Sequence, residues 1–434
     1  MIPDIGRIGL TVSSNSPAGL KEDEILSAIE RALSEHADQL KKILIIPPDI
    51  TRFHSGAGII TQHIYKMLHK TCKIDILPAL GTHVPMTREE CALMYGDIPF
   101  ECFVEHNWRN DVVKLGEVPA DFVNDVSEGL LNESIDVEVN KLILDPTYDL
   151  ILSVGQVVPH EVVGMANYSK NIFVGCGGSN MINSSHMLGA FYGLERLMGK
   201  DHSPVRKVFD YAENKYIKDL PLVYILTVTA PYNDDQAIYG LFIGRDRKYF
   251  EQAVELSVEK NIIFTEEPFK KVVVYLDEQE FKSTWLGNKA VYRTRMAIAD
   301  GGDLIILAPG VNKFGEDELI DKLIRKYGYV GRLNILELVE KNEDLKLNLS
   351  AAAHLIHGSS DSRFRITYCT RHLTKEEVEG VGFNYLSYDE AIKTYDPKTL
   401  TEGFNNVGGE EVYYISNPAL GLWADRRKFF ADQS

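Results

Sequence analysis

The chain is poor in cysteine, and its few cysteines follow no recognisable pattern. Only five occur among 434 residues, and no two of them form a C-x-x-C pair. A disulfide framework needs paired cysteines, and a structural zinc site usually needs closely spaced thiolates. The sequence therefore predicts neither. We expect most of the cysteines to be buried apolar residues, with a nucleophilic role for Cys176, which lies among glycines, as a minor alternative.

Basic charge and long apolar runs are also scarce. Basic residues number 46 against 63 acidic ones, which gives a formal net charge of −17. Because binding to a phosphate backbone needs a concentrated basic face, no nucleic-acid partner is expected. No run of about 18 apolar residues occurs, and the first residues do not resemble a secretory leader. These features predict a cytoplasmic protein with no membrane partner.

The sequence does contain the alternation of strands and helices that is typical of α/β proteins. Its 434 residues exceed the size at which one hydrophobic core usually stops growing, so two domains are expected. In the first part, apolar runs fit strands over Ile43–Ile46, Ile74–Leu77 and Leu150–Val154, and a helical pattern covers Ile59–Leu68. This βαβ rhythm predicts a sheet of parallel strands.

A hairpin and a second α/β unit are predicted further along the chain. Leu222–Thr229 and Ile238–Ile243 fit the hairpin, and a helix follows over 247–260. From 271 the pattern predicts a strand over Val272–Leu276, a helix over about Asn288–Ala299 that stops at Gly301-Gly302, and a strand over Leu304–Leu307. We therefore expect an N-terminal α/β cofactor-binding domain over 1–265 and a smaller C-terminal α/β domain over 266–409. The segment 410–434 is expected to pack back on the first domain.

Polar residues gather in the loops that follow the predicted strands. These loops are Pro48–Arg52, Gly81–His83 and Val158–His160. Because ligands of open α/β sheets lie beyond the carboxyl ends of the strands, we expect the three loops to share one edge. The first loop contains Asp49, Thr51 and Arg52, a set suited to a phosphate or a carboxylate. The alternative is a surface turn held by an Asp–Arg pair.

The second and third loops each carry a histidine in the same position after a strand. His83 and His160, if they lie on either side of a ligand, can accept and donate a proton near neutral pH. Lys170 and His186 follow around a glycine-rich turn. A buried lysine can be a covalent attachment point, and a histidine can bind a transition metal. Taken singly, an ordinary solvated lysine and an ordinary histidine at a helix start are the favoured explanations.

The second unit adds three candidates. Lys289 lies near the start of the predicted helix and close to Trp285, where a cation can hold an anionic substrate that closes between domains. His354 and His357 share one face of a predicted helix. Their spacing permits weak metal binding but is more typical of an ordinary amphipathic face.

The order and spacing of these residues resemble the lactate racemase family, the nickel-pincer nucleotide-dependent 2-hydroxyacid racemases and epimerases. The resemblance runs over most of the chain and depends on the combination rather than on any single motif. The residues that carry it are Asp49-Ile50-Thr51-Arg52, Gly81–Thr87, Val158-Pro159-His160, Lys170, His186, and Lys289 followed by Gly301-Gly302.

The resemblance implies an isomerase of two α/β domains with the active site in the cleft between them. It implies a nickel-pincer nucleotide, a pyridinium-3,5-bisthiocarboxylic acid mononucleotide that holds nickel. In this comparison Lys170 matches the lysine joined to the cofactor, and His186 matches the histidine that completes the nickel coordination. The remaining matches are His83 and His160 for the acid and base, Arg52 and Lys289 for contacts to the substrate, and Asp49, Thr51 and Arg52 for the phosphate side of the cofactor.

The implied reaction inverts the α carbon of a 2-hydroxyacid by reversible hydride transfer to the cofactor, while the two histidines exchange the hydroxyl proton. The expected partners are a small 2-hydroxyacid and the proteins that make the cofactor, and a homo-oligomer is left open. Asn167-Tyr168-Ser169 stands where the lactate enzymes have Gly-Gly-Arg, and Leu286 stands where they have glutamine. We therefore expect a substrate other than lactate, such as a larger hydroxyacid or a sugar acid epimerised at its second carbon.

Two other functions remain open at this point. In the first, the chain is a hydrolase or lyase that uses a common divalent metal, with His160 and His186 as ligands and Lys170 as an ordinary base. In the second, it is a non-catalytic protein of the same fold that holds a nucleotide at Asp49–Arg52. An adduct on Lys170 together with nickel would distinguish the racemase from both.

Overall fold

The computed structural model describes residues 8–233 and 235–431, which form two compact α/β units. The first unit comprises Met1–Gly189 and Leu197–Asn261, and the second comprises Ala190–Arg196 and Ile262–Ser434. Each unit is built on its own six-stranded sheet. The α/β class predicted from the alternation of strands and helices is therefore confirmed.

The sheet of the first unit has the strand order β1-β10-β9-β6-β2-β3. Its strand β2 (Lys42–Ile46) pairs in parallel with the edge strand β3 (Lys73–Ile76) and with β6 (Leu150–Gln156). These are the three strands expected from the apolar runs. Since they are parallel neighbours, their carboxyl ends lie at one edge of the sheet, as predicted for the loops that carry the polar residues.

The other half of this sheet is the predicted hairpin. Strands β9 (Leu222–Tyr232) and β10 (Asp235–Gly244) pair antiparallel, β9 also pairs in parallel with β6, and β1 (Gly9–Ser13) closes the edge against β10. Helix α8 (Arg247–Asn261) follows the hairpin and packs on β9 and β10.

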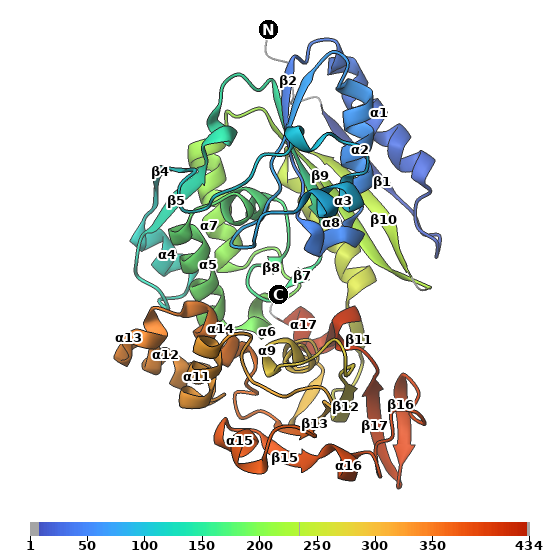
Figure 1. Cartoon of the computed structure of the whole chain (residues 1–434), viewed down its shortest axis with the longest axis vertical. Helices are drawn as coiled ribbons and strands as arrows, with labels where there is room; N and C mark the ends of the chain where they lie inside the picture. The colour runs from blue at the N-terminus through green and yellow to red at the C-terminus, as the bar shows by residue number, and fades with distance from the viewer. Residues whose placement is uncertain (1–7, 234, 432–434) are drawn as a thin grey trace. The chain divides into compact units, whose positions relative to one another are not determined.

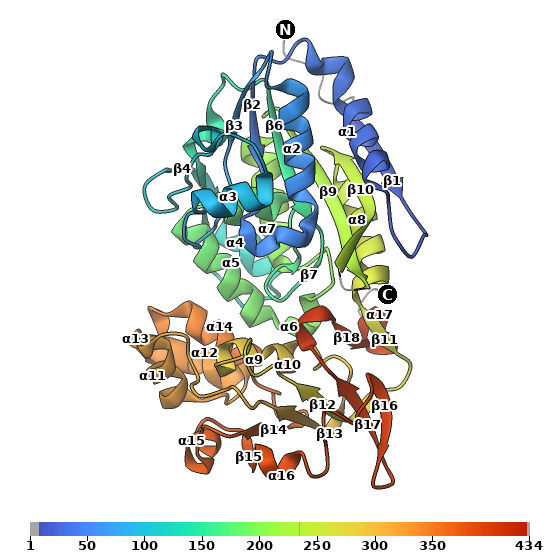
Figure 2. The same cartoon turned by 45° about the vertical axis from the view of Figure 1, so that its right-hand side comes forward.

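Helices cover both faces of this sheet (Figures 1 and 2). On one face, α1 (Glu22–Ala37), α2 (Ala57–Leu68) and α3 (Arg88–Tyr95) bury apolar side chains against alternate residues of the strands. The alternation places Ile43 and Ile45 of β2 in this cluster, because successive strand residues point to opposite faces. The opposite face meets α8, whose Phe250 is fully buried. Both faces are thus apolar, as expected for a parallel sheet.

Smaller elements surround the edge where the polar loops lie. Strands β4 (Val112–Val118) and β5 (Ile135–Asn140) form a two-stranded sheet joined by α4 (Ala120–Val126). Strands β7 (Pro159–His160) and β8 (Gly164–Met165) form a short hairpin directly after β6. The chain then enters the π-helical turn η5 (Asn171–Gly175), α5 (Ser179–Tyr192), α6 (Leu194–Leu197), α7 (Pro204–Ala212) and the π-helical turn η6 (Glu213–Ile217).

The sheet of the second unit has the order β15-β14-β13-β12-β17-β16. Strands β12 (Phe269–Tyr275), β13 (Ile298–Leu307), β14 (Arg365–Thr370), β15 (Asn384–Ser387) and β17 (Glu410–Ile415) are parallel, and β16 (Gly403–Val407) is antiparallel to β17. Its helices are α9 (Thr284–Gly287), α10 (Lys289–Tyr292), α11 (Glu318–Tyr327), α12 (Arg332–Lys341), α13 (Glu343–Lys346), α14 (Leu349–His357), α15 (Lys375–Gly380) and α16 (Tyr388–Ala391).

Two predictions for the second unit were wrong. The helix expected over 288–299 is reduced to the short helix α10 (Lys289–Tyr292), and Gly301-Gly302 lies inside β13 instead of stopping a helix. The reason is tertiary: Ile298 pairs with Phe269 of β12, and the register then shifts around the glycines, where Gly301 has φ 78°. A glycine at such a bulge accepts a backbone conformation that other residues avoid.

The segment 410–434 contributes two strands. Its strand β17 pairs with β12, and its strand β18 (Trp423–Asp425) pairs with β11 (Ile263–Thr265), which lies at the end of the range predicted for the first domain. Both strands belong to the second unit, which begins at Ile262. Helix α17 (Arg426–Ala431) follows β18. No helix within 8–233 and 235–431 is both long and apolar enough to cross a membrane.

Candidate active site

The loop after β2 begins with a buried carboxylate that organises its neighbours. Asp49 caps the turn η2 (Ile50–Ser55): its Oδ1 accepts hydrogen bonds from the backbone N–H of Thr51 at 3.1 Å and from the Thr51 hydroxyl. Its Oδ2 accepts a hydrogen bond from Nδ1 of His83, in the loop after β3, at 2.5 Å. A turn held by an Asp–Arg pair, the alternative from the sequence, is therefore not what organises Asp49. The carboxylate joins the first two loops.

This pairing determines where the proton of His83 resides. The side chain of Asp49 is 5% exposed and that of His83 is 57% exposed. Burial raises the pKa of Asp49, but the hydrogen bonds from His83 and Thr51 outweigh it, so the net pKa lies below its ordinary value. Asp49 is thus ionised near neutral pH and holds a proton on Nδ1 of His83. In the neutral ring Nε2 then carries the lone pair and can accept a proton.

His160 lies in a different environment from His83. It ends β7 and is buried, and its Nδ1 accepts a hydrogen bond from the backbone N–H of Val162 at 3.1 Å. Burial lowers the pKa of His160 well below its ordinary value, and the positive charges of Lys170 and Arg52 act in the same direction. His160 is therefore neutral near pH 7, with its proton on Nε2, where it can be donated in a hydrogen bond.

Lys170 follows an irregular turn and lies at the start of η5. Burial lowers the pKa of its amine to about 8, and the charge of Arg52 contributes in the same direction while Glu161 opposes it. A lysine with this pKa is partly neutral near pH 7, and a neutral amine is a nucleophile. An ordinary solvated lysine, the alternative from the sequence, does not describe this residue.

His186 presents one ring nitrogen to its surroundings. It lies in the middle of α5 and not at the helix start that we expected. Its Nδ1 donates a hydrogen bond to the carbonyl of Ile182 at 2.6 Å, which leaves the Nε2 lone pair available in the neutral ring. Burial lowers the pKa of His186, so the neutral form is favoured. A backbone partner on one nitrogen and a lone pair on the other is the arrangement of histidine ligands to metals.

Four of the predicted residues of the first unit belong to one electrostatic cluster. His160, Lys170 and His186 act on one another's charge, and Arg52 acts on both His160 and Lys170. Asp49 also acts on Lys170, and His83 is linked to the cluster through its hydrogen bond to Asp49. Lys289 belongs to the second unit, where it opens α10 with its ammonium 5.8 Å from the centre of the Phe281 ring. Its contact with a substrate remains a prediction.

One residue of this cluster escaped the sequence analysis. Glu161 follows His160 directly, with its carboxylate 4.0 Å from Nδ1 of that histidine, and its negative charge acts on His160, Lys170 and His186. The only signal in the sequence was its position next to His160. The negative charge of Glu161 favours the protonated forms of these three bases, so it limits how far burial lowers their pKa values.

The glycine-rich run lets distant parts of the backbone and side chains approach closely. A Cβ on Gly177 would meet the carbonyl oxygen of Phe173 at 1.8 Å, and a Cβ on Gly178 would meet a carboxylate oxygen of Glu138 at 2.2 Å. Cys176, between them, is fully buried, and burial raises the pKa of its thiol, so no nucleophilic role is supported.

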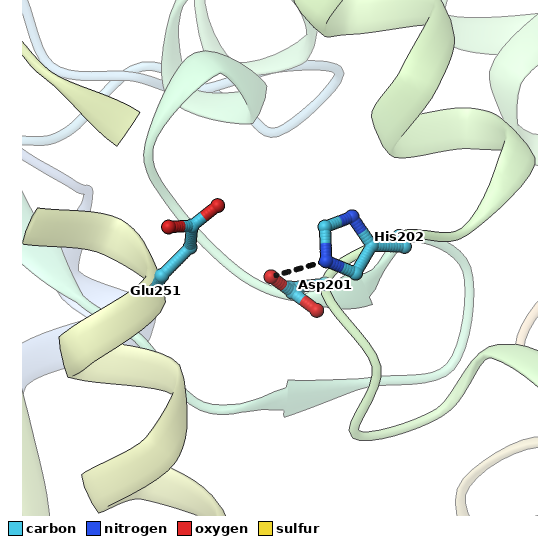
Figure 3. A group of neighbouring side chains, drawn as sticks. All are labelled: Asp201, His202 and Glu251. Atoms are coloured by element: carbon cyan, nitrogen blue, oxygen red, sulfur yellow. Dashed lines mark ion pairs between the residues drawn. The ribbon is translucent and has the colours of Figure 1, made fainter. Parts of the chain in front are cut away.

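A site for a common divalent metal is not found at His160 and His186. Within the described part of the chain, only Asp201, His202 and Glu251 form a group of three ligands close enough to hold an ion (Figure 3). The guanidinium of Arg247 already donates to Glu251 at 3.1 Å and lies 3.6 Å from Asp201, so a cation of the protein itself is already paired with both carboxylates. In the second unit, His354 is buried and bonded to the Tyr329 hydroxyl at 2.8 Å, which fits a core residue.

Comparisons with known proteins find similarity to lactate racemases. Residues 9–194 match the family model of the lactate racemase N-terminal domain. The chain is similar to the lactate racemase of Thermoanaerobacterium thermosaccharolyticum, with 26% identity over 306 residues, 66% of each chain. It is also similar to the lactate racemase of Lactiplantibacillus plantarum, with 28% identity over 221 residues, 49% of this chain and 47% of that one. The chain thus matches about two thirds and about half of the lengths of these relatives.

Two solved structures share the fold. A crystal structure of a protein from Thermotoga maritima has a TM-score of 0.74 at 22% identity, covering 95% of this chain and 99% of that one. The lactate racemase apoprotein from Thermoanaerobacterium thermosaccharolyticum has a TM-score of 0.68 at 19% identity, covering 98% of this chain and 96% of that one. At these identities the likeness concerns the fold.

Proposed function

Because this chain belongs to the lactate racemase family, we propose that it is an isomerase that inverts the α carbon of a 2-hydroxyacid. The observation that supports this most directly is the cluster of His160, Lys170 and His186. Burial and like charges favour the uncharged forms of these three bases, and His83 with its Asp49 partner lies in the loop next to them along the sheet edge.

The residues of the cluster fit a nickel-pincer nucleotide. The partly neutral amine of Lys170 suits a covalent bond to a thiocarboxylate arm, and the free Nε2 of His186 suits a nickel ligand. Arg52, with Thr51 and the turn that Asp49 caps, suits the phosphate side of the nucleotide. When bound, this group would accept a hydride from the α carbon and return it to the opposite face.

The two histidines would handle the hydroxyl proton of the substrate. His83 is prepared to accept a proton at Nε2, because Asp49 holds the other ring proton and stabilises the imidazolium that forms. His160 offers its Nε2 proton to an oxygen, because the N–H of Val162 occupies Nδ1. Return of the proton from the other side would require the two rings to exchange these states during the reaction.

Substrate selection would depend on the charged groups and on the second unit. Arg52 and Lys289 are proposed to hold the carboxylate of the hydroxyacid. Tyr168, which distinguishes this chain from the lactate enzymes, packs its ring 4.2 Å from that of Tyr224 and 4.8 Å from that of Phe250, in the core. The argument for a substrate other than lactate therefore depends on Leu286 and not on Tyr168. We propose a larger hydroxyacid or a sugar acid.

The test uses protein isolated from a host that makes the cofactor. Peptide mass spectrometry should find a nucleotide-sized adduct on the tryptic peptide that contains Lys170, together with nickel in the protein. A panel of single enantiomers of 2-hydroxyacids and sugar acids should then show inversion at the α carbon, with deuterium at that carbon retained in the product. Lys170→Arg is the matched control: it keeps the positive charge but has no nucleophilic amine, so adduct and inversion should both disappear.

Three results would overturn the proposal. An unmodified Lys170 with no nickel, in a host shown to load another enzyme with this cofactor, would contradict the cofactor assignment. Zinc or magnesium bound instead would favour the hydrolase or lyase. Bound nucleotide without any turnover, and without change on His83→Ala, would favour the non-catalytic protein.

A further inference from the structure

The turn that precedes Lys170 has an unusual backbone. Asn167 and Tyr168 are consecutive non-glycine residues with φ 63° and 55°. Asparagine tolerates this left-handed region, but a bulky aromatic residue rarely adopts it. Such a conformation persists only where the surrounding structure holds it, and it is common at functional sites. The contacts of this turn therefore show what places Lys170.

One buried arginine contacts the whole turn from outside. Arg206, in α7, is fully buried. Its Nη2 donates to the carbonyls of Met165 at 2.7 Å and Asn167 at 3.2 Å, and its Nη1 donates to the hydroxyl of Ser169 at 2.8 Å. A rigid planar fork that bonds to three positions along a five-residue segment limits how that segment can bend. The last of these partners is the residue directly before Lys170.

Aromatic packing holds the same turn from its other side. The ring of Tyr168 stacks on Phe250 with an interplanar angle of 12°, and the guanidinium of Arg206 lies 4.6 Å from the centre of the Phe250 ring. Phe250 thus contacts both the residue with the strained backbone and the arginine that bonds to it. On the other side of Lys170, the Asn171 side chain donates to the carbonyl of Ile46 and to the Ser153 hydroxyl, both at 3.1 Å, and so attaches to β2 and β6.

The charge of Arg206 has no carboxylate bonded to it. Within residues 8–233 and 235–431 its hydrogen bonds go to two carbonyls and one hydroxyl, and Asp210, on the same helix, bonds to Arg247 at 2.5 Å instead. Burying a charge is unfavourable unless it is fully paired. A neutral side chain that filled this space would avoid that penalty, so a role for the charge itself is indicated. The charge of Arg206 is one of the groups that lower the pKa of the Lys170 amine.

We propose that Arg206 is the positioning residue for Lys170: its guanidinium fixes Met165–Ser169 and places a buried positive charge within electrostatic reach of the amine. The inference that this amine receives the cofactor rests on the proposed function. The positioning itself does not, because it concerns the conformation and the reactivity of Lys170 in the protein without cofactor.

The experiment uses the full chain produced without cofactor. Lys170 is acetylated with acetic anhydride over a range of pH, and mass spectrometry follows its peptide relative to that of Lys322, an exposed lysine of the second unit. Hydrogen exchange of the peptide over 165–170 reports on the turn. In the wild type, acetylation of Lys170 should rise with a midpoint near the pKa of about 8.

Three variants separate charge from geometry. Arg206→Met should raise the midpoint by about half a pH unit, which lowers the neutral fraction of the amine near pH 7 by about threefold, and should speed exchange of the turn. Arg206→Lys keeps a charge but not the planar fork, so the midpoint should stay and exchange should still accelerate. Ser169→Ala should keep the midpoint and accelerate exchange less. If Arg206→Met does not fold, the other two variants carry the test of the geometry.

Arg247→Met is the matched control. This arginine is also in the first unit and near Phe250, but its described hydrogen bonds go to Asp201, His202, Asp210 and Glu251. It should leave both the midpoint and the exchange of the turn unchanged. A folded Arg206→Met protein with the wild-type midpoint and wild-type exchange would overturn the proposal. Faster exchange with an unchanged midpoint in that variant would reduce Arg206 to a purely structural residue and would also contradict it.

The two proposals can fail separately. If wild-type protein from a cofactor-making host carries no adduct on Lys170, the proposed function is wrong while the effects of Arg206 on the free amine stand or fall by themselves. If the adduct is present but Arg206→Met acetylates like the wild type, only the positioning role is wrong.

Discussion

Two parts of the same sheet edge treat charge in opposite ways. In the loops after β2 and β3, Asp49 is ionised and paired with the exposed ring of His83 at 2.5 Å. In the segment after β6 and in α5, the basic groups His160, Lys170 and His186 have lowered pKa values because they are buried and lie near other positive groups. The first part stabilises the negative charge of a carboxylate, and the second disfavours the positive charge of its bases.

The difference matches the separate requirements of the proposed reaction. A proton acceptor needs a group that stabilises the charge it gains, and the carboxylate of Asp49 does this for His83. A covalent anchor and a metal ligand need free lone pairs. Burial raises the neutral fraction of the Lys170 amine and favours the neutral ring of His186. In this proposal, proton acceptance by His83 and cofactor attachment at Lys170 and His186 take place at different positions along one sheet edge.

The largest expected effect is on turnover when either histidine is removed. His83→Asn and His160→Asn should each lower the inversion rate by about 10²- to 10⁴-fold, the usual contribution of a general acid or base. Because Lys170 and His186 remain, the Lys170 adduct and nickel should still be present in both variants. The measurement is the inversion rate per nickel-loaded enzyme. If either variant keeps the wild-type rate, that histidine is not part of the proton pathway.

The next largest effect is on the stability of the Lys170→Met variant. Removing the amine should stabilise the protein, although it should abolish turnover. The pKa of Lys170 falls from 10.5 to about 8 in the folded protein. Below about pH 8 the charged, buried amine therefore lowers the free energy of unfolding. Lys170→Met should therefore stabilise the cofactor-free protein by about 2 to 3 kcal/mol near pH 7, as measured by urea unfolding.

The pH dependence provides the check on this sign. Between about 8 and 10.5 the unfolded chain binds more protons at Lys170 than the folded chain, so wild-type stability should rise with pH in this window. The advantage of Lys170→Met should shrink over the same range. Lys322→Met, at an exposed lysine, is the control and should show no such trend. An advantage that stays constant with pH would mean that the amine is not desolvated.

Asp49→Asn should have a smaller effect with a different pH window. The pKa of Asp49 lies below 3.8 in the folded state, so its stabilisation is fully present above about pH 4 and is lost as the pH falls through the folded value. The variant should lose about 1 to 2 kcal/mol near pH 7, the usual range for a hydrogen bond to a charged group. The loss should fade below pH 4. A variant as stable as the wild type at neutral pH would show that the His83 pair contributes nothing.

The smallest expected effect concerns the buried histidines in mild acid. The pKa values of His160 and His186 lie below 6.5 when folded, chiefly because of burial. The unfolded chain therefore binds more protons below about pH 6.5, and wild-type stability should rise as the pH increases towards that value. His186→Asn should flatten part of this slope. An unchanged slope would place His186 in a more hydrated position than the structure does.

Much of the first unit could be predicted because its signals are local. Apolar runs marked β2, β3 and β6, and capping boxes formed by Thr87 with Glu90 and by Thr374 with Glu377 begin α3 and α15. Strand ends carried the polar residues that gather at the sheet edge. The second unit was harder, because the stretch before β13 has a helical pattern that pairing with β12 overrides at Ile298.

Other features depended on distant parts of the chain meeting. Nothing near Asp49 in the sequence indicates that its partner is His83, and nothing near Lys170 indicates that Arg206 bonds to the preceding turn. The β-strand made by 410–415 joins the second sheet because a parallel position beside β12 is open to it. These are long-range pairings that no local pattern encodes.

The sequence by itself determined the α/β class, the strands of the first sheet and the residue types at their ends, because periodicity and turn residues act over a few neighbours. Only the tertiary structure decided the protonation of those residues. His83 is paired with a buried carboxylate and His160 accepts a hydrogen bond from a backbone N–H, although both are the same residue type in the sequence. Burial and neighbouring charge set their pKa values, and both arise only when segments far apart in sequence pack together.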